Sequence, residues 1–190
     1  MERVCIFLAN GFETIEALTP IDYLRRAGGE KSAILVSTTG DLNVKSAQGV
    51  VVKADALIDE LDAETITAAI IPGGLPGATN LRDNEQVINL VKILYDDEKL
   101  LAAICAGPIV LEKAGILSGK NATSYPGFEE EMASAKYQND RVVVDENIIT
   151  ARGPAIATDF ALEIVKKIYG KKKFEEIKSD ILYDLSLIHI

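Results

Sequence analysis

The chain alternates short apolar runs with amphipathic helical patterns, and this alternation restricts its fold more than any other feature. Runs rich in β-branched and small residues predict buried strands at residues 3–9, 32–38, 67–74 and 100–105. The patterns between and after them predict helices at residues 14–28, 84–98, 108–117, 157–170 and 174–183. Apolar strands that alternate with helices are typical of a parallel sheet covered by helices on both faces. We therefore expect an α/β protein.

Two further segments predict local strand pairs. Residues 43–56 favour a hairpin or two short strands, and residues 141–151 favour a hairpin that turns near residues 145–147. No repeat or linker interrupts the chain, so residues 1–185 are expected to form one domain. The apolar end at residues 186–190 stays open between a disordered tail, a cloning remnant and a cover for an apolar patch.

Charge and composition exclude several classes of protein. The net charge of −9 argues against nucleic-acid binding, which needs a basic surface. No apolar stretch approaches the roughly 18 residues of a membrane span, and the first residues do not resemble a signal peptide, so we expect a cytoplasmic protein. With two cysteines, no C-x-x-C pair and His189 as the only histidine, we expect no metal site.

Three segments follow predicted strands and are candidates for the site. They are residues 11–16, the pair Gly73 and Gly74, and Cys105. In sheets of this kind, ligands bind outside the carboxyl ends of the strands. We therefore expect the three turns to meet in one crevice.

Cys105 lies between a predicted buried strand and a predicted helix. Ala106 and Gly107 leave room for a sharp turn, and Pro108 suits the first turn of a helix. Unpaired N–H groups at the start of that helix would lower the thiol pKa and make the sulfur nucleophilic and oxidisable. The alternative is a small buried hydrophobic residue, which is the interpretation we favour for Cys5 inside the first strand.

Glu16 is the acid expected to face Cys105. Partial burial beside a thiolate would raise its pKa, so that it could stay protonated and donate a hydrogen bond to the sulfur. The alternative is an exposed helical glutamate, and Glu13 is expected to be a solvated acid at the helix start. The amides of Gly74 and Ala106 could bind a developing oxyanion, or the glycines could form a plain turn.

These segments resemble a known family. "GFETIEALTPIDYLRRAG", "AAIIPGG", "LLAAICAGPIVLEKAGIL" and "ITARGP" are similar to the signature segments of the ThiJ/PfpI superfamily, in the branch of the Parkinson-disease-associated deglycase and chaperone. The resemblance implies a flavodoxin-like, doubly wound, mostly parallel sheet and a homodimer without a cofactor. It also implies that Cys105 is the reactive cysteine, that Glu16 is its protonated partner, and that Gly74 and Ala106 supply the oxyanion amides.

Two positions depart from the family pattern. Protease-like relatives carry a histidine where this chain has Ala106, so a peptidase or amidotransferase is not expected. The deglycase branch often has a histidine where this chain has Tyr125, and a phenol is a poor base near neutral pH. Gly73, Tyr125 and Arg152 are possible pocket residues.

Two functions remain open at this point. The first is a glyoxalase- or deglycase-like enzyme of lyase or hydrolase type, which uses Cys105 on small α-oxoaldehydes or early glycation adducts. The second is a chaperone-like sensor of oxidative stress, in which Cys105 is oxidised to a sulfinate with little turnover.

Overall fold

The computed structural model describes residues 3–183, so the tail at residues 186–190, with His189, lies outside the described residues. A seven-stranded sheet in the order β10-β11-β7-β6-β1-β2-β5 forms its centre. The strands are β1 (Arg3–Leu8), β2 (Ala33–Ser37), β5 (Ala56–Leu57), β6 (Ile66–Ile71), β7 (Leu100–Ile104), β10 (Val142–Asp145) and β11 (Ile148–Ala151). All neighbours pair in parallel except β10 and β11. The expected mostly parallel α/β sheet is confirmed.

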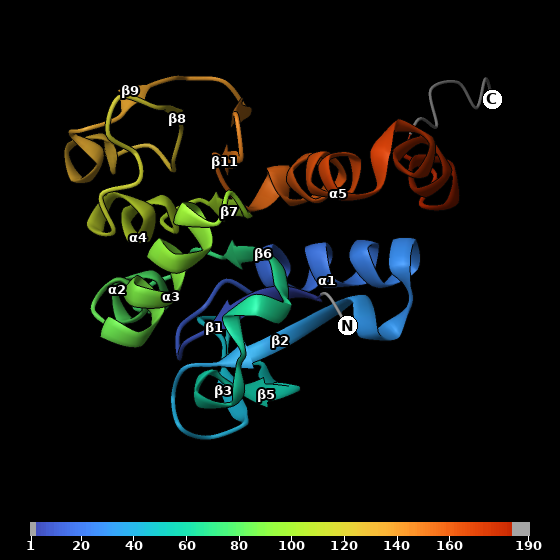
Figure 1. The fold of residues 1–190 in the computed structure, drawn as a ribbon, viewed down its shortest axis with the longest axis horizontal. Helices are drawn as coiled ribbons and strands as arrows, with labels where there is room; N and C mark the ends of the chain where they lie inside the picture. Colours follow the sequence, from blue (N-terminus) through green and yellow to red (C-terminus); the bar gives the residue numbers. More distant parts are fainter. Residues whose placement is uncertain (1–2, 184–190) are drawn as a thin grey trace.

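Helices cover both faces of this sheet (Figure 1). On one face lie α1 (Thr14–Gly28) and α5 (Ala157–Asp180), and on the other lie α2 (Gly77–Arg82), α3 (Glu85–Asp96) and α4 (Pro108–Lys113). Successive side chains of a strand point to opposite faces. Along β1, Ile6 packs towards α1 and α5, whereas Cys5 and Phe7 pack into the core on the other face. Each such buried aliphatic side chain stabilises the fold by roughly 1.5–3 kcal/mol.

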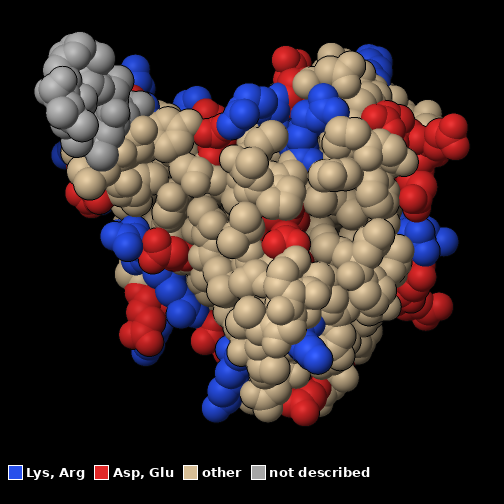
Figure 2. Space-filling model, turned by 180° about the vertical axis from the view of Figure 1, so that it is seen from behind, with Lys and Arg blue, Asp and Glu red and all other residues tan. Residues whose placement is uncertain are grey.

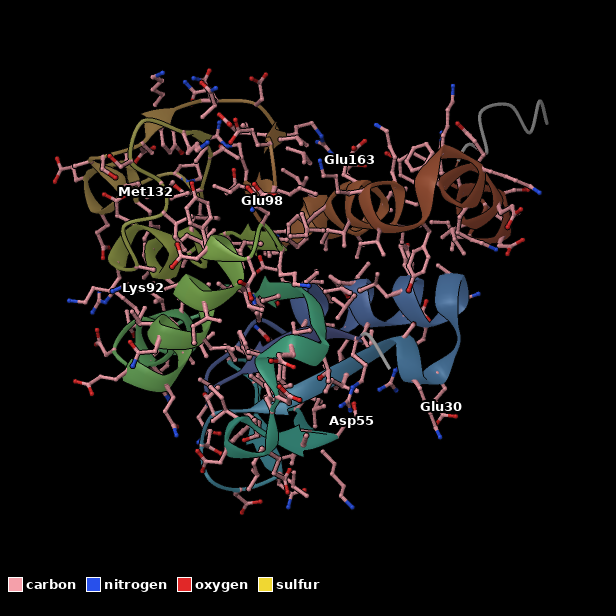
Figure 3. The ribbon with its side chains drawn as sticks, viewed as in Figure 1. Glu30, Asp55, Lys92, Glu98, Met132 and Glu163 are labelled. Atoms are coloured by element: carbon pink, nitrogen blue, oxygen red, sulfur yellow. The ribbon has the colours of Figure 1, made fainter. Side chains whose placement is uncertain are left out.

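The first half of the chain follows the sequence prediction closely. Helix α1 has the predicted bounds, and residues 43–56 contain an antiparallel hairpin of β3 (Asn43–Lys45) and β4 (Val51–Lys53). Asp55, labelled in Figure 3, accepts hydrogen bonds from Arg25 at 2.6 Å and from the N–H of Leu35 at 2.8 Å. This carboxylate therefore joins the end of α1 to β2.

Two other helices differ from the prediction. Helix α4 ends at Lys113 instead of reaching residue 117, and Gly115 follows it with a φ of 80°. Helix α2 was not predicted from its short segment. The two predicted C-terminal helices are both present within α5, because Gly170, with a φ of 82° that is easily adopted only by glycine, is non-helical and divides α5 into two helices.

A short excursion between α4 and β10 carries Tyr125. Its two strands, β8 (Asn121–Ala122) and β9 (Lys136–Tyr137), pair in parallel. Met132, labelled in Figure 3, is 1% exposed and packs into the core on the α4 face, which anchors the excursion. Short 3₁₀ turns lie at Glu30–Ser32, Ile58–Glu60, Ala63–Thr65, Glu129–Met132 and Pro154–Ile156.

The surface carries charges of both signs. Figure 2 shows the face opposite to that of Figure 1, where small groups of basic side chains alternate with acidic ones around a mostly uncharged middle. On the described part of this face, no broad basic patch is present. Within residues 3–183, no helix is both long enough and apolar enough to span a membrane.

Candidate active site

Three turns meet at the carboxyl edge of the sheet, as the sequence predicted. Strands β7, β6 and β1 are neighbours in parallel register, so the turns that follow them lie side by side. They carry five residues that we call the inner site: Glu16, Gly73, Gly74, Cys105 and Ala106. This is the edge at which α/β sheets of this kind bind ligands.

Cys105 forms a strained elbow between β7 and α4. Its φ of 63° lies in the left-handed region, which a residue with a side chain adopts at a cost of about 1–3 kcal/mol. Both its backbone groups are held, since its N–H donates to the carbonyl of Ala151 and its carbonyl accepts the N–H of Tyr125, each at 2.9 Å. Gly107 completes the turn, because a Cβ there would lie 2.4 Å from the carbonyl oxygen of Ile71. The elbow therefore presents a half-buried sulfur in a fixed position.

Glu16 lies in the first turn of α1 and is fully buried. Its Oε2 accepts the N–H of Gly73 at 2.8 Å, and its carboxyl group contacts the thiol of Cys105. Its Oε1 is buried without a hydrogen-bond partner among the described residues. The expectation that Glu16 faces Cys105 is therefore met, and its alternative as an exposed helical residue is wrong.

The two glycines allow these groups to come together. A Cβ on Gly73 would lie 2.7 Å from the Cβ of Cys105 and 2.8 Å from Oε2 of Glu16. Gly74 has a φ of 83°, and a Cβ there would lie 2.4 Å from the backbone nitrogen of Glu13. No side chain fits at either position, so these glycines do more than form a plain turn.

Burial raises the pKa of both groups in the Glu16–Cys105 pair. It raises the pKa of Glu16 to about 7, although the N–H of Gly73 and the contact with Cys105 oppose the rise, and the charge of Glu13 adds to it. Burial, followed by the charge of Glu16, raises the pKa of the Cys105 thiol to about 12. Groups this close lose their protons in two steps that belong to the pair. Between those steps the pair carries one negative charge, which lies mostly on the carboxyl oxygens because the thiol has the higher pKa.

The predicted net lowering of the thiol pKa is wrong, although the amide of Ala106, just before α4, does act in the predicted direction. Helix α4 has only six residues, and the N–H groups of Gly107 and Ile109 donate to the carbonyls of Ile104 and Ala106. The groups that lower the pKa of the thiol are the amides of Ala106 and Gly74, and burial with the charge of Glu16 outweighs them. When Glu16 holds the proton, that charge is gone and its O–H can donate to the sulfur. The thiolate therefore forms once the pair has lost one proton and the remaining thiol proton moves to the carboxyl group of Glu16.

Tyr125 and Arg152 lie outside the inner site. Tyr125 is 48% exposed, and its ring lies near Gly153, where a Cβ would be 3.2 Å from the ring. Arg152 is half-buried and donates to the carbonyl and the side-chain oxygen of Asn139 at 2.9 and 3.2 Å. Within residues 3–183, neither side chain forms a hydrogen bond with Cys105, and their role in a pocket stays a prediction.

Sequence reasoning missed the environment of Glu13. This residue was expected to be solvated, but it is half-buried and its Oε2 accepts a 2.6 Å hydrogen bond from the side chain of Gln48. No local signal in the sequence connects two residues 35 positions apart. Among residues 3–183, no cluster of histidine, cysteine and carboxylate side chains could hold a metal ion.

Comparison with known proteins identifies related sequences. The sequence pattern described as the DJ-1/PfpI family matches residues 2–167. Protein DJ-1 homolog B of Arabidopsis thaliana is 37% identical over 173 residues, which is 90% of this chain and 39% of that protein. The chain thus spans less than half the length of that relative. Deglycase PH1704 of Pyrococcus horikoshii is 31% identical over 166 residues, which is 86% of this chain and 98% of that protein.

A solved structure extends the agreement to the whole fold. Oxidized DJ-1 of Toxoplasma gondii superposes with a TM-score of 0.89 and is 37% identical, covering 97% of this chain and 100% of that chain. The expected flavodoxin-like fold and the resemblance to the ThiJ/PfpI superfamily are both confirmed. The chain belongs to the DJ-1/PfpI family.

Proposed function

We propose that the chain is a cofactor-independent enzyme that uses Cys105 to convert small α-oxoaldehydes to α-hydroxy acids, and that it acts on early glycation adducts by the same chemistry. The observation that carries the proposal is the contact between the Cys105 thiol and a fully buried carboxyl group whose pKa is raised to about 7. A general acid or base works best when its pKa lies near the working pH. The name of the P. horikoshii relative, a deglycase, is consistent with this chemistry.

The reaction begins with addition of sulfur to the aldehyde carbon. Glu16 takes the thiol proton, the new C–S bond forms, and the carbonyl π electrons move to oxygen. Glu16 then passes its proton to that oxygen, which gives a hemithioacetal and leaves Glu16 ionised. The N–H groups of Gly74 and Ala106 already act on the sulfur, so an oxyanion on the adjacent carbon would lie within their reach.

A proton transfer then moves the oxidation level between two carbons. Glu16 removes the hydrogen of the former aldehyde carbon as a proton and returns it to the neighbouring carbonyl carbon, while the hydroxyl proton of the first carbon passes to the oxygen of the second. The first carbon becomes a thioester while the second is reduced to an alcohol, so no external oxidant or reductant is needed. Water then breaks the C–S bond, releasing the hydroxy acid and the free thiol.

Methylglyoxal tests the proposal, with lactate as the product to be measured. The wild-type protein should form lactate, Cys105→Ala should form none, and Glu16→Gln should lose at least about 100-fold in rate, the usual contribution of a positioned acid–base group. Absence of lactate from the wild type, or equal rates in wild type and Cys105→Ala, would disprove the activity.

A redox sensor is the second candidate, because Cys105 is only half-buried and its sulfur lies beside a carboxyl group and two amides. The solved T. gondii relative is described as oxidized. Two equivalents of peroxide would convert the thiol to a sulfinic acid with release of two waters. A gain of two oxygen atoms at Cys105, measured by intact mass together with absent aldehyde turnover, would favour the sensor.

The remaining sequence expectations belong to the same proposal. We place Gly73, Tyr125 and Arg152 around the substrate, and we propose a cytoplasmic homodimer that binds neither nucleic acid nor membranes. We propose that the Tyr125 side chain borders the substrate and does not act as a base, since a phenol is a poor base near neutral pH.

A further inference from the structure

The β3–β4 hairpin is hydrogen-bonded along the loop that leads into α1. The N–H of Gly11 donates to the carbonyl of Lys45 at 2.8 Å, and the N–H of Ala47 donates to the carbonyl of Phe12 at 2.9 Å. On the other side of this loop, the N–H of Glu13 donates to the carbonyl of Gly73 at 2.9 Å. The loop is therefore held between the hairpin and the inner site.

Gln48, at the tip of the hairpin, extends this contact with its side chain. Its Nε2 donates to Oε2 of Glu13 at 2.6 Å. Its Oε1 accepts from the hydroxyl of Thr14 at 2.8 Å and from the N–H of Thr14 at 3.3 Å. The amide orientation is consistent, because its nitrogen faces a carboxylate and its oxygen faces two donors.

This contact supports a helix end that lacks a cap of its own. The first N–H groups of an α-helix have no partner within the helix, and here the side chain of Glu13 caps none of them. Gln48 supplies that acceptor from another part of the chain. Glu16 lies in the same first turn of α1, two residues after Thr14.

We propose that Gln48 is a positioning residue of the site, which fixes the first turn of α1 through Glu13 and Thr14 and so holds the carboxyl group of Glu16 against Gly73 and Cys105. Its effect on turnover rests on the proposed function, whereas its effect on the reactivity of Cys105 needs no substrate. Gln48 itself touches none of the reacting groups and acts through Glu13 and Thr14.

The charge of Glu13 gives this contact an electrostatic consequence. In the described chain, the ionisable groups that act on Glu16 are Cys105 from the elbow and Glu13 from the loop before α1, and Glu13 raises the pKa of Glu16. Loss of the Gln48 hydrogen bond would let the Glu13 carboxylate move into water. The first turn of α1 would loosen and admit water to Glu16, so the pKa of Glu16 would fall towards its ordinary value.

The test is the pH dependence of alkylation of Cys105 by iodoacetamide. In Gln48→Leu, we expect the rate at pH 7 to fall by about fivefold, as for loss of one ordinary hydrogen bond, and the midpoint near pH 7 to move to lower pH. Gln86→Leu is the matched control. Gln86 is also an exposed glutamine that donates to a carboxylate, that of Asp59, and it makes no hydrogen bond to the inner site. Gln86→Leu should leave both the alkylation rate at pH 7 and the pH midpoint unchanged.

A variant that exchanges the residues at positions 13 and 48 distinguishes loss of their hydrogen bond from a general disturbance of the hairpin. In Glu13→Gln/Gln48→Glu, the carboxylate at position 48 can still accept from Thr14 and from the amide at position 13, so the rate should recover to within about twofold of wild type. Wild-type rate and midpoint in Gln48→Leu, or an equal loss in Gln86→Leu, would overturn the proposal. If the midpoint moves but the wild type forms no lactate, the proposed function fails while the role of Gln48 stands.

Discussion

The two cysteines lie in two regions of the molecule, and these regions give their thiols opposite reactivity. Cys5 is 1% exposed inside β1, and burial raises its pKa to about 12, with Arg3 lowering it. Cys105 stands at the end of β7, and burial together with the charge of Glu16 raises its pKa to about 12 as well. The difference is the partner, because Glu16 can take the proton from Cys105, whereas within residues 3–183 no carboxyl group acts on Cys5. Reactivity in this chain is therefore a property of a pair of residues.

The largest effect expected from this comparison is selective alkylation. Iodoacetamide at neutral pH should modify Cys105 at least about 1,000-fold faster than Cys5, because exposing a central strand requires opening that costs several kcal/mol. Peptide mass mapping of the native protein measures the two rates. Comparable modification of Cys5 in folded protein would break the comparison.

The next effect is a pH-dependent stability that belongs to Glu16. Its pKa is raised in the folded state, so its contribution is fully present below about pH 4.5 and is lost as the pH rises through about 7. The rise from 4.5 to about 7 corresponds to about 3 kcal/mol in the free energy of unfolding. Urea unfolding at several pH values should show this loss in wild type and not in Glu16→Gln. Parallel curves for the two proteins would mean that Glu16 ionises normally.

The third effect is expected from a substitution of Gly73, which lies between Cys105 and Glu16. In Gly73→Ala, the new Cβ would meet both Cys105 and Glu16, so we expect at least about a tenfold loss in the alkylation rate at pH 7, as for displacement of a charged hydrogen bond. Gly153→Ala is the control, since its Cβ would meet only the ring of Tyr125 at 3.2 Å. Equal effects of the two substitutions would show that the close packing at Gly73 is unimportant.

The smallest effect is expected at Tyr125. This residue supports the elbow through its backbone N–H, which donates to the carbonyl of Cys105, and its side chain is largely exposed. Tyr125→Phe keeps that N–H and should change the alkylation rate by less than about twofold, as for surface substitutions in general. A larger loss in the alkylation rate would mean that the phenol hydroxyl takes part in the inner site.

The comparison also shows what the sequence could and could not predict. The core position of Cys5, the bounds of α1 and the meeting of Glu16 with Cys105 followed from local periodicity and from the rule that parallel strands end at one edge. The direction of the Cys105 pKa did not, because it depends on how deeply Glu16 is buried and on a helix α4 that ends at Lys113.

Contacts between distant segments were also beyond local patterns. Gln48 and Glu13 lie 35 residues apart, and their hydrogen bond exists only because the β3–β4 hairpin folds over the start of α1. Composition and periodicity carry no information on such a pairing. The same holds for Met132, whose burial beneath the Tyr125 excursion depends on packing against the α4 face.

The most direct test of the shared proton is the pH profile of Cys105 alkylation in wild type and in Glu16→Gln. The wild-type rate should rise with a midpoint near pH 7, where the pair loses its first proton. In Glu16→Gln this midpoint should disappear, and the rate should rise only at alkaline pH, because burial still opposes the thiolate and no carboxylate remains to accept the proton. The same midpoint near pH 7 in both proteins would contradict the account.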